Sequence, residues 1–317
     1  MLAAGIEFGG TKLLGVVIDS AGNVVAEARE PTPYGADELV DAILALADEL
    51  RPFSTIGIGA AGLVNRAGEL VYAPNVGTIT GLPLAARLEA ALGHRVPVVN
   101  DAACAAVAEV RYGVAQGLRE VAVVTLGTGI GGSFIVNGEM HQGSNGFSGE
   151  PGHMIVNPSG PLCVCGQRGC WERYASGAGF HYLTSVHVER GDAPALLAQA
   201  HGDPSKVTGA MVDAAARSGD RGALGIYEDF SRWLALGIVN LSNLIDPQAV
   251  VLGGGMIAQA DLFLEQTRRF VGEMRYANHV RPPLQLEVAT LGPRAGAIGA
   301  ALVGAKAAHR KEPISSA

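Results

Sequence analysis

The sequence lacks the features that mark several large classes of protein. No segment approaches the roughly 18 to 20 continuous apolar residues of a transmembrane helix, and the start has no basic region ahead of a long apolar run. Cysteines number only four, too few and too crowded for a secreted disulfide framework. Basic residues are outnumbered, 23 Lys and Arg against 30 Asp and Glu, which argues against a polyanionic partner. We therefore expect a cytoplasmic protein that binds neither membranes nor nucleic acid.

Glycine is the residue that the sequence has in excess. It fills 44 of 317 positions, twice the usual share of roughly 7%, so many positions are expected to need a conformation or a close approach that a Cβ atom would block. The content of 48% hydrophobic and 17% charged residues is that of a folded globular protein. At roughly 150 residues per domain, the length predicts two domains with separate cores.

Strand-like and helix-like segments alternate in both halves of the chain. Each half opens with two apolar runs joined by a Gly/Thr-rich turn, which predicts β-hairpins over residues 3–19 and 121–138. Further strands are expected at residues 56–60, 96–99 and 249–255, and helices at residues 36–50, 82–92, 102–113 and 294–308. This alternation predicts an α/β protein of two layered domains with a ligand cleft between them.

Three glycine-rich segments are candidate phosphate-binding loops. Glu7-Phe8-Gly9-Gly10-Thr11-Lys12 combines a carboxylate, glycines, a hydroxyl and an ammonium group, the parts needed near a metal-bound polyphosphate. The segment from Gly127 to Gly132 joins two strands, unlike a dinucleotide fingerprint, which leads into a helix. Gly253-Gly254-Gly255 follows an apolar strand and would let an adenine ring approach the backbone. An ordinary hairpin turn for the first segment and a helix-entry turn for the third are the alternatives.

Asn100-Asp101 lies where a buried-type strand meets an alanine-rich helix. The carboxyl edge of a sheet is where α/β proteins usually bind ligands. If the substrate is an alcohol, Asp101 is a candidate general base that accepts its proton as the oxygen attacks phosphorus. The alternative is that this aspartate only caps the helix.

One histidine and three cysteines have the spacing of a metal site. His153, Cys163, Cys165 and Cys170 complete a tetrahedral Cys₃His set, which ordinarily holds zinc structurally, and glycines inside the cluster suit a tight knuckle. Unconnected buried or redox cysteines are one alternative. Catalytic zinc is disfavoured because no ligand position is left open for water.

Two acidic residues bracket this knuckle. Folding around zinc is expected to bring Glu150 and Glu172 into one cavity with His153. Carboxylates that accept hydrogen bonds from neighbouring hydroxyls are what recognition of a polyol requires. Solvated surface acids are the alternative.

These motifs resemble the kinase branch of the repressor, open-reading-frame and kinase (ROK) family of sugar-binding proteins. The resemblance covers nearly the whole chain, through FGGTK, VND, LGTGIGG, GEPGH, CVCGQRGCWE, and VLGGG followed by GAIGAA. It implies the two-domain actin-like or hexokinase-type (ribonuclease H-like) fold with an interdomain cleft. We expect a small α/β domain of residues 1–113 plus 293–317 and a large α/β domain of residues 114–292 with the zinc knuckle.

The resemblance also implies roles for individual residues. Asp101 would be the catalytic base, and Glu7, where many members have aspartate, would be linked to magnesium. The residues implied to bind the sugar are Gly62, Asn75, Asn100, Asp101, Glu150, His153 and Glu172. Those implied to hold ATP with Mg²⁺ are Gly9, Gly10, Thr11, Lys12, Gly127, Thr128, Gly129, Gly131, Gly132, Gly254 and Gly255. Structural Zn²⁺ would be held by His153, Cys163, Cys165 and Cys170.

The expected activity is transfer of the ATP γ-phosphoryl group to a sugar hydroxyl, with the 6-hydroxyl of glucose as the leading acceptor. Glucokinase-like members of the family often carry a tryptophan just after the APN segment, whereas here Asn75 leads into VGTITGLPL, so this part is more similar to the family's N-acetylhexosamine kinases. An N-acetylhexosamine, an amino sugar or a cyclitol is the alternative acceptor. A non-catalytic sugar sensor is the alternative from another class. The family's repressors carry a helix-turn-helix ahead of the sugar-binding part, and none is expected here because the first hairpin starts within the first few residues. The resemblance also suggests a homodimer or homotetramer.

Overall fold

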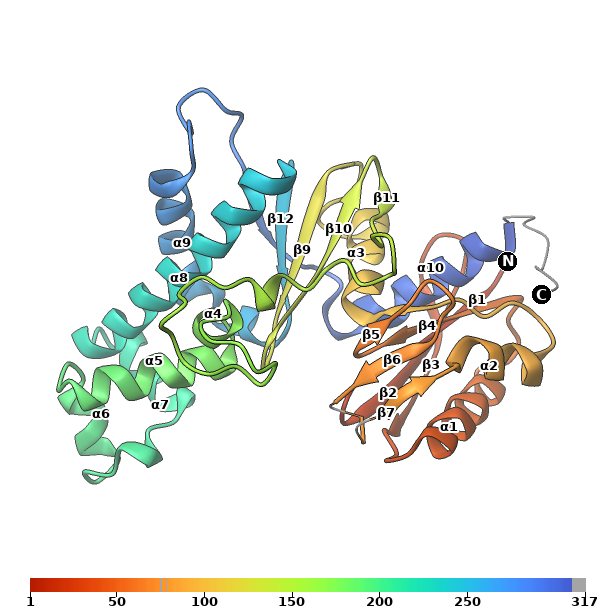
Figure 1. Ribbon diagram of the computed structural model, residues 1–317, viewed down its shortest axis with the longest axis horizontal. Coiled ribbons are helices and arrows are strands. Elements are labelled where there is room, and N and C mark those ends of the chain that lie inside the picture. Colours follow the sequence, from red (N-terminus) through yellow and green to blue (C-terminus); the bar gives the residue numbers. More distant parts are fainter. Residues whose placement is uncertain (75, 78, 310–317) are drawn as a thin grey trace. The chain divides into compact units, whose positions relative to one another are not determined.

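A computed structural model of the chain describes residues 1–74, 76–77 and 79–309, which form two compact units (Figure 1). Unit 1 comprises Met1–Val123, Ser133–Gly149 and the C-terminal segment from Ala289. Unit 2 comprises Val124–Gly132 and Glu150–Val288. Within the described ranges, no helix is long and apolar enough to cross a membrane. The domain boundaries expected from the sequence stay a prediction.

The elements alternate between strands and helices, as the sequence predicts. Unit 1 contains β1 (Ala3–Phe8), β2 (Lys12–Ile18), β3 (Val24–Pro31), α1 (Ala36–Glu49), β4 (Thr55–Ala60), β5 (Leu63–Val64), β6 (Leu70–Ala73), β7 (Ile79–Leu82), α2 (Leu84–Leu92), β8 (Val98–Asn100), α3 (Asp101–Tyr112), β11 (Glu139–Met140), η4 (Gly292–Arg294) and α10 (Ala295–His309). Strands β9 (Val121–Leu126) and β10 (Ile130–Val136) contain residues of both units. Unit 2 contains η1 (Pro151–His153), α4 (Glu172–Ala175), α5 (Gly177–Glu189), α6 (Pro194–Gln199), η2 (Pro204–Lys206), α7 (Gly209–Arg217), α8 (Arg221–Ile245), β12 (Ala249–Gly253), η3 (Gly255–Gln259), α9 (Ala260–Met274) and β13 (Gln285–Val288).

The main sheet of unit 1 has the strand order β3-β2-β1-β4-β8. Strand β1 pairs antiparallel with β2 through the predicted hairpin and parallel with β4, which is parallel to β8. The register places Phe8 opposite Ala60, and Ala60 opposite Asn100. The carboxyl ends of three parallel strands therefore meet at one edge, the place where α/β sheets present ligand-binding groups.

Helix α10 lies directly on this sheet because glycines face it. A Cβ atom on Gly5 would clash with the carbonyl oxygen of Ala297, and one on Gly57 with that of Ala300. On its other side, a Cβ atom on Gly299 of α10 would clash with the backbone of Cys104 in α3. This close approach explains why the predicted helix at residues 294–308 is built from small residues.

Bulkier side chains fill the core on the opposite face of the sheet. Ile6 and Phe8 of β1 pack there with Leu39, Ile43 and Leu46 of α1, all 0–1% exposed. These α1 residues recur every three to four positions, which is why the segment forms an amphipathic helix. A small sheet of order β5-β6-β7 adds its apolar residues to the same core.

Unit 2 is mainly helical beside its strands. Its strands β12 and β13 run parallel and are the members of the second five-stranded sheet, of order β11-β10-β9-β12-β13, that lie wholly in unit 2. Aromatic rings of α5, α8 and α9 form the centre of the helical part, where Phe180 contacts Tyr227 and Phe230, and Phe230 contacts Phe263. The 25 residues of α8 form the longest described helix and support the segment that carries the metal-site residues.

Several expected boundaries differ from the structure by one or two residues. The helix expected at 82–92 begins at Leu84, because Leu82 ends β7 and Pro83 precedes the helix. The strand expected at 249–255 ends at Gly253, and the strand expected at 96–99 covers Val98–Asn100. Strands β3 and β5 to β7 were not expected, since β3 is charged and largely exposed and the other three have only two to four residues.

Candidate functional site

Asn100 and Asp101 stand where β8 ends and α3 begins, at the carboxyl edge of the unit 1 sheet. The side-chain oxygen of Asn100 accepts a hydrogen bond from the backbone N–H of Ala103 at 3.2 Å, so Asn100 caps the helix. Its amide nitrogen donates to the carbonyl oxygen of Gly62 at 3.2 Å, which joins two predicted sugar contacts. The N-cap of α3 is therefore Asn100 rather than Asp101.

Gly62 has to be glycine at this place. Its φ of 134° lies where side chains are disfavoured, and a Cβ atom would clash with the carbonyl oxygen of Tyr72. Asn75, the other loop residue implied to contact the sugar, lies outside the described residues. Within the described residues, the hydrogen bond from Asn100 to Gly62 therefore connects this loop to the start of α3.

The Asp101 carboxyl group is held in the first turn of α3 and has a raised pKa. Its Oδ1 accepts a hydrogen bond from the backbone N–H of Ala102 at 2.9 Å. Burial raises the pKa of Asp101 from 3.8 to about 6, while N–H groups at the helix start and the Asn100 side chain act in the opposite direction. A carboxylate with a pKa just below neutral pH is mostly ionised and still accepts a proton readily.

Glu7 lies near the end of β1 and is held by the first turn of α10. The backbone N–H of Ala297 stabilises its carboxylate, and a Cβ atom on Gly296 would clash with that group. Burial and the negative charge of Asp101 raise the pKa of Glu7 to about 7, and Lys12 partly offsets them. Two carboxyl groups with raised pKa values therefore occupy one edge of unit 1, an arrangement that suits a cation or a shared proton.

The first glycine-rich loop is the tip of the β1–β2 hairpin. The N–H of Gly9 donates to the carbonyl oxygen of Lys12 at 3.0 Å, and the hydroxyl of Thr32 donates to the carbonyl oxygen of Gly9 at 2.7 Å. A Cβ atom on Gly9 would meet nothing within 4 Å. Thr11 and Lys12 are exposed at this tip, while Gly10 is half-buried. The protein itself therefore does not require glycine at position 9, so the open space beside the backbone is free for a ligand.

In unit 2, the other two glycine-rich segments lie beside one another. The second loop, Gly127, Thr128, Gly129, Ile130, Gly131 and Gly132, joins β9 to β10, and the N–H of Gly127 donates to the carbonyl oxygen of Gly129 at 3.0 Å. Gly254 has a φ of 86°, and a Cβ atom there would clash with the carbonyl oxygen of Leu126. Gly255 has open space beside it. The triple glycine therefore packs against the strand end from which the second loop starts.

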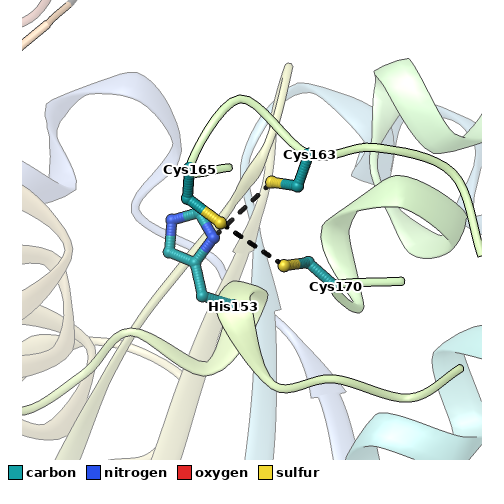
Figure 2. A group of neighbouring side chains, drawn as sticks. All are labelled: His153, Cys163, Cys165 and Cys170. Carbon is teal, nitrogen blue, oxygen red and sulfur yellow. Dashed lines mark hydrogen bonds between the residues drawn. The ribbon is translucent and has the colours of Figure 1, made fainter. Parts of the chain in front are cut away.

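The four predicted metal ligands converge in unit 2 (Figure 2). Their ligand atoms all lie within 4.8 Å of one another, with 3.6 Å between the sulfurs of Cys165 and Cys170 and 3.8 Å from the Cys163 sulfur to Nδ1 of His153. Zinc bonds of about 2.3 Å to sulfur and 2.0 Å to nitrogen place tetrahedral ligand atoms about 3.5–3.8 Å apart. The donor set and its spacing therefore fit a zinc ion.

The backbone around these ligands forms a tight knuckle. The N–H of Cys163 donates to the carbonyl oxygen of Gln167 at 2.8 Å, and Gly166 turns the chain with a φ of 88°. Trp171, next to the last ligand, is fully buried, and its indole N–H donates to the carbonyl oxygen of Trp233 at 2.8 Å. Gly237 of α8 makes room for that ring, since a Cβ atom there would clash with it. The knuckle is thus anchored on α8.

Glu172 joins the knuckle to the second glycine-rich loop. Its Oε1 accepts a hydrogen bond from the Cys163 thiol at 3.0 Å and lies 3.9 Å from Nδ1 of His153. Its Oε2 accepts from the backbone N–H of Ile130 at 3.4 Å, and a Cβ atom on Gly129 would clash with it. The structure therefore brings Glu172 next to His153, as expected, and adds a contact to the loop that the sequence did not indicate.

Glu150 occupies a different position from Glu172. It precedes η1, its carbonyl oxygen accepts from the N–H of His153 at 3.2 Å, and its side chain is exposed. Its sequence-based role as a sugar ligand stays a prediction.

The chain is similar to known proteins along nearly its whole length. Residues 3–307 match the ROK family. The chain belongs to the ROK family. Among its ROK relatives, it is 37% identical to a glucokinase of Streptomyces coelicolor over 95% of this chain and 96% of the relative. It is 31% identical to an N-acetylmannosamine kinase of Salmonella typhimurium, over 96% and 98% of the two chains.

A solved structure shares the fold of this ROK chain. It is a ROK family glucokinase from Streptomyces griseus in complex with glucose and AMPPNP, which superposes with a TM-score of 0.82 at 35% identity and covers 96% of this chain and 100% of the other. The predicted family and the α/β, actin-like, hexokinase-type fold are both confirmed.

Two contributors to the site were not foreseen from the sequence. At the start of α10, the N–H of Ala297 holds Glu7 and Gly296 leaves room for its carboxylate, although the GAIGAA motif to which they belong was recognised only as part of the family pattern. A glycine in the first turn of a helix is the signal that points to such a close contact, because glycine disfavours helices unless space demands it.

Proposed function

We propose that this ROK protein is an ATP-dependent hexose kinase that transfers the γ-phosphoryl group to the 6-hydroxyl of glucose. The observation that carries the proposal is the Asp101 carboxyl group, which stands at the carboxyl edge of the sheet with a pKa of about 6. The 37% identity with a glucokinase and the likeness to a glucokinase solved with glucose and AMPPNP support the choice of donor and acceptor.

Asp101 would act as the general base. As the hydroxyl oxygen of the sugar forms a bond to the γ-phosphorus, the bond from that phosphorus to the β,γ-bridging oxygen breaks and ADP leaves. The hydroxyl proton passes to the Asp101 carboxylate late in the transfer. Asn100 would orient the sugar together with the Gly62 loop, to which it is already hydrogen-bonded.

ATP would bind through the glycine-rich loops. The backbone N–H groups of the loop Gly9 to Lys12 and of the loop Gly127 to Gly132 would approach phosphate oxygens, and Gly254 and Gly255 would approach the adenine ring. Glu7 fits a role in holding Mg²⁺, since its carboxylate lies close to a second carboxylate in unit 1, and oxygen ligands are those that Mg²⁺ prefers. The ion, when bound, supplies positive charge to the phosphates.

The knuckle would hold a structural zinc ion. With His153, Cys163, Cys165 and Cys170 as ligands, all four tetrahedral positions are filled, so the site is suited to organising the fold rather than to activating water. Since Nδ1 of His153 is the nitrogen near Cys163, Nε2 would be free to contact a sugar hydroxyl. Glu150 and Glu172 would accept further hydrogen bonds from sugar hydroxyls.

The test is a substrate panel with ATP and Mg²⁺, read as ADP release. We expect the highest kcat/KM with glucose, and comparison of that ratio among sugars gives the specificity directly. A higher ratio with N-acetylmannosamine would favour the second candidate, which the 31% identity with an N-acetylmannosamine kinase supports. ADP release with none of the hexoses, N-acetylhexosamines, amino sugars and cyclitols would contradict kinase activity and favour a sugar sensor.

The assembly and location are further proposals. On family resemblance we propose a homodimer or homotetramer that acts in the cytoplasm. Light scattering of the purified protein gives the mass, for which the monomer value is 32.5 kDa.

A further inference from the structure

Glu109 is a buried carboxylate that none of the recognised motifs contains. It lies in α3 about two turns after Asp101 and is 1% exposed. Its Oε1 accepts hydrogen bonds from the backbone N–H groups of Thr290 at 3.0 Å and Leu291 at 2.9 Å. Its Oε2 accepts from the N–H of Val114 at 3.0 Å and from the hydroxyl of Thr290 at 3.3 Å.

The surroundings of Glu109 are shaped for a carboxylate. Both of its oxygens face donors, and an ionised carboxylate is the side chain that accepts on both sides. A Cβ atom on Gly113 would clash with Oε2, so glycine is required where the chain leaves α3. A glutamine at this position would turn its NH₂ group toward N–H donors on one side and leave them unpaired.

These bonds connect α3, which begins with one member of the acidic pair of unit 1, to the start of α10, which contacts the other. Thr290 and Leu291 lead directly into η4 and α10, whose first turn holds the Glu7 carboxylate through the N–H of Ala297. Helix α3, which contains Glu109, begins with Asp101. Between these ends the backbones of α3 and α10 touch, because Gly299 leaves no side chain between them.

We propose that Glu109 is a positioning residue for phosphoryl transfer, which fixes the start of α10, and with it Glu7, relative to Asp101 at the start of α3. The inference rests on the proposed function. Glu109 is 1% exposed and its oxygens accept from Val114, Thr290 and Leu291, so it would touch neither substrate nor nucleotide. It acts by tying the segment at residues 290–291 to the side of α3, so that two helices packed along their length also have fixed ends.

The test compares Glu109→Gln with Glu89→Gln. Glu89 is a matched control because it lies in another helix of unit 1, α2, and also accepts a backbone hydrogen bond, from Val96 at 3.0 Å. A small displacement of reacting groups costs on the order of 10²-fold in rate, so we expect kcat of Glu109→Gln to fall at least about tenfold. KM for the sugar should stay within about threefold, since this residue contacts no substrate, and Glu89→Gln should keep kcat within about twofold.

Hydrogen–deuterium exchange provides a readout that does not need activity. In Glu109→Gln, amides of peptides covering residues 114 and 290–297 should exchange faster, whereas in Glu89→Gln they should match the wild type. If the wild type phosphorylates no sugar, the proposed function fails while this exchange still tests the link. Equal exchange in the two variants, or a wild-type kcat in Glu109→Gln, would overturn the proposal.

A milder variant covers the case in which Glu109→Gln does not fold. Thr290→Val removes only the 3.3 Å hydroxyl bond and keeps the shape of the side chain. Loss of one such bond corresponds to an effect of roughly two- to tenfold, so kcat should fall within that range while KM is kept. An unchanged kcat with unchanged exchange at residues 290–297 would contradict the role of Glu109.

Discussion

Two regions that serve one proposed reaction are organised by different means. At the start of α3 in unit 1, the carboxyl groups of Asp101 and Glu7 are placed by backbone contacts, since Asn100 caps the helix and the N–H of Ala297 holds Glu7. In the knuckle of unit 2, four side chains converge on a space of metal-site dimensions, and Glu172 contacts two of them. The first arrangement is expected to survive loss of a side chain, and the second to depend on the zinc ion that we propose for it.

Asp101 is proposed to take part in the reaction, whereas the knuckle is proposed to support the fold. A change at Asp101 should alter the rate of phosphoryl transfer and leave the fold intact, because its neighbours are held without it. A change at the knuckle should alter the fold of the segment and, through Glu172, the shape of the second glycine-rich loop. Four experiments test this difference between the two regions.

The largest effect is expected from Asp101→Asn. Removal of a positioned general base costs about 10² to 10⁴ in rate, so kcat should fall by that factor while the affinity for the sugar is largely kept. ADP release and a binding titration measure the two quantities. Asp220→Asn is the matched control, since Asp220 also stands at a helix start and asparagine preserves its cap. Near wild-type turnover of Asp101→Asn would remove this residue from the mechanism.

Metal removal is expected to have the next largest effect, and it should lower thermal stability as well as activity. A chelator that strips the knuckle should lower kcat/KM at least about tenfold and reduce thermal stability, because a metal that binds only the folded state contributes to folding. Elemental analysis and thermal unfolding before and after chelation provide the measurement. Protein that is fully active and contains no zinc would refute the assignment of the knuckle.

The pH dependence of kcat/KM is expected to reflect ionisation at the start of α3. Because a metal ligand and a base must both be deprotonated to act, kcat/KM should decline as the pH falls through about 7 and then about 6, the pKa values to which burial raises Glu7 and Asp101. Protonation of Asp101 alone accounts for a loss of about tenfold one unit below its pKa. Initial rates between pH 5 and 8, with enzyme stability checked at each pH, test this. A flat profile down to pH 5 would mean that no group of this pKa controls the reaction.

The smallest effect is expected from a change in α8, the helix that anchors the knuckle, and it concerns stability alone. A Cβ atom on Gly237 would clash with the buried ring of Trp171, whereas one on Gly225 in the same helix would be 3.5 Å from His187, an ordinary contact. Overpacking costs about 1–3 kcal/mol, so Gly237→Ala should unfold at lower denaturant. Gly225→Ala should be as stable as the wild type or about 0.5–1 kcal/mol more stable. The reverse order would show that α8 does not anchor the knuckle.

The sequence predicted what depends on local pattern. Paired apolar runs joined by glycine-rich turns identified both hairpins, and the Cys/His spacing identified a cluster whose atoms do lie together. Contacts between distant segments were out of reach, because no local pattern shows that Gly129 must make room for Glu172 or that Glu109 accepts from residues 290–291. Short strands such as β5, with two residues, are too short to show the alternation of apolar and polar residues that predicts a strand.

A crystal structure with glucose and a non-hydrolysable ATP analogue would show directly whether Asp101 is placed to act as the general base. We predict a carboxylate oxygen of Asp101 within about 2.6–3.2 Å of the glucose 6-hydroxyl, with that hydroxyl facing the γ-phosphate. A sugar bound elsewhere, or a 6-hydroxyl out of reach of Asp101, would contradict the account.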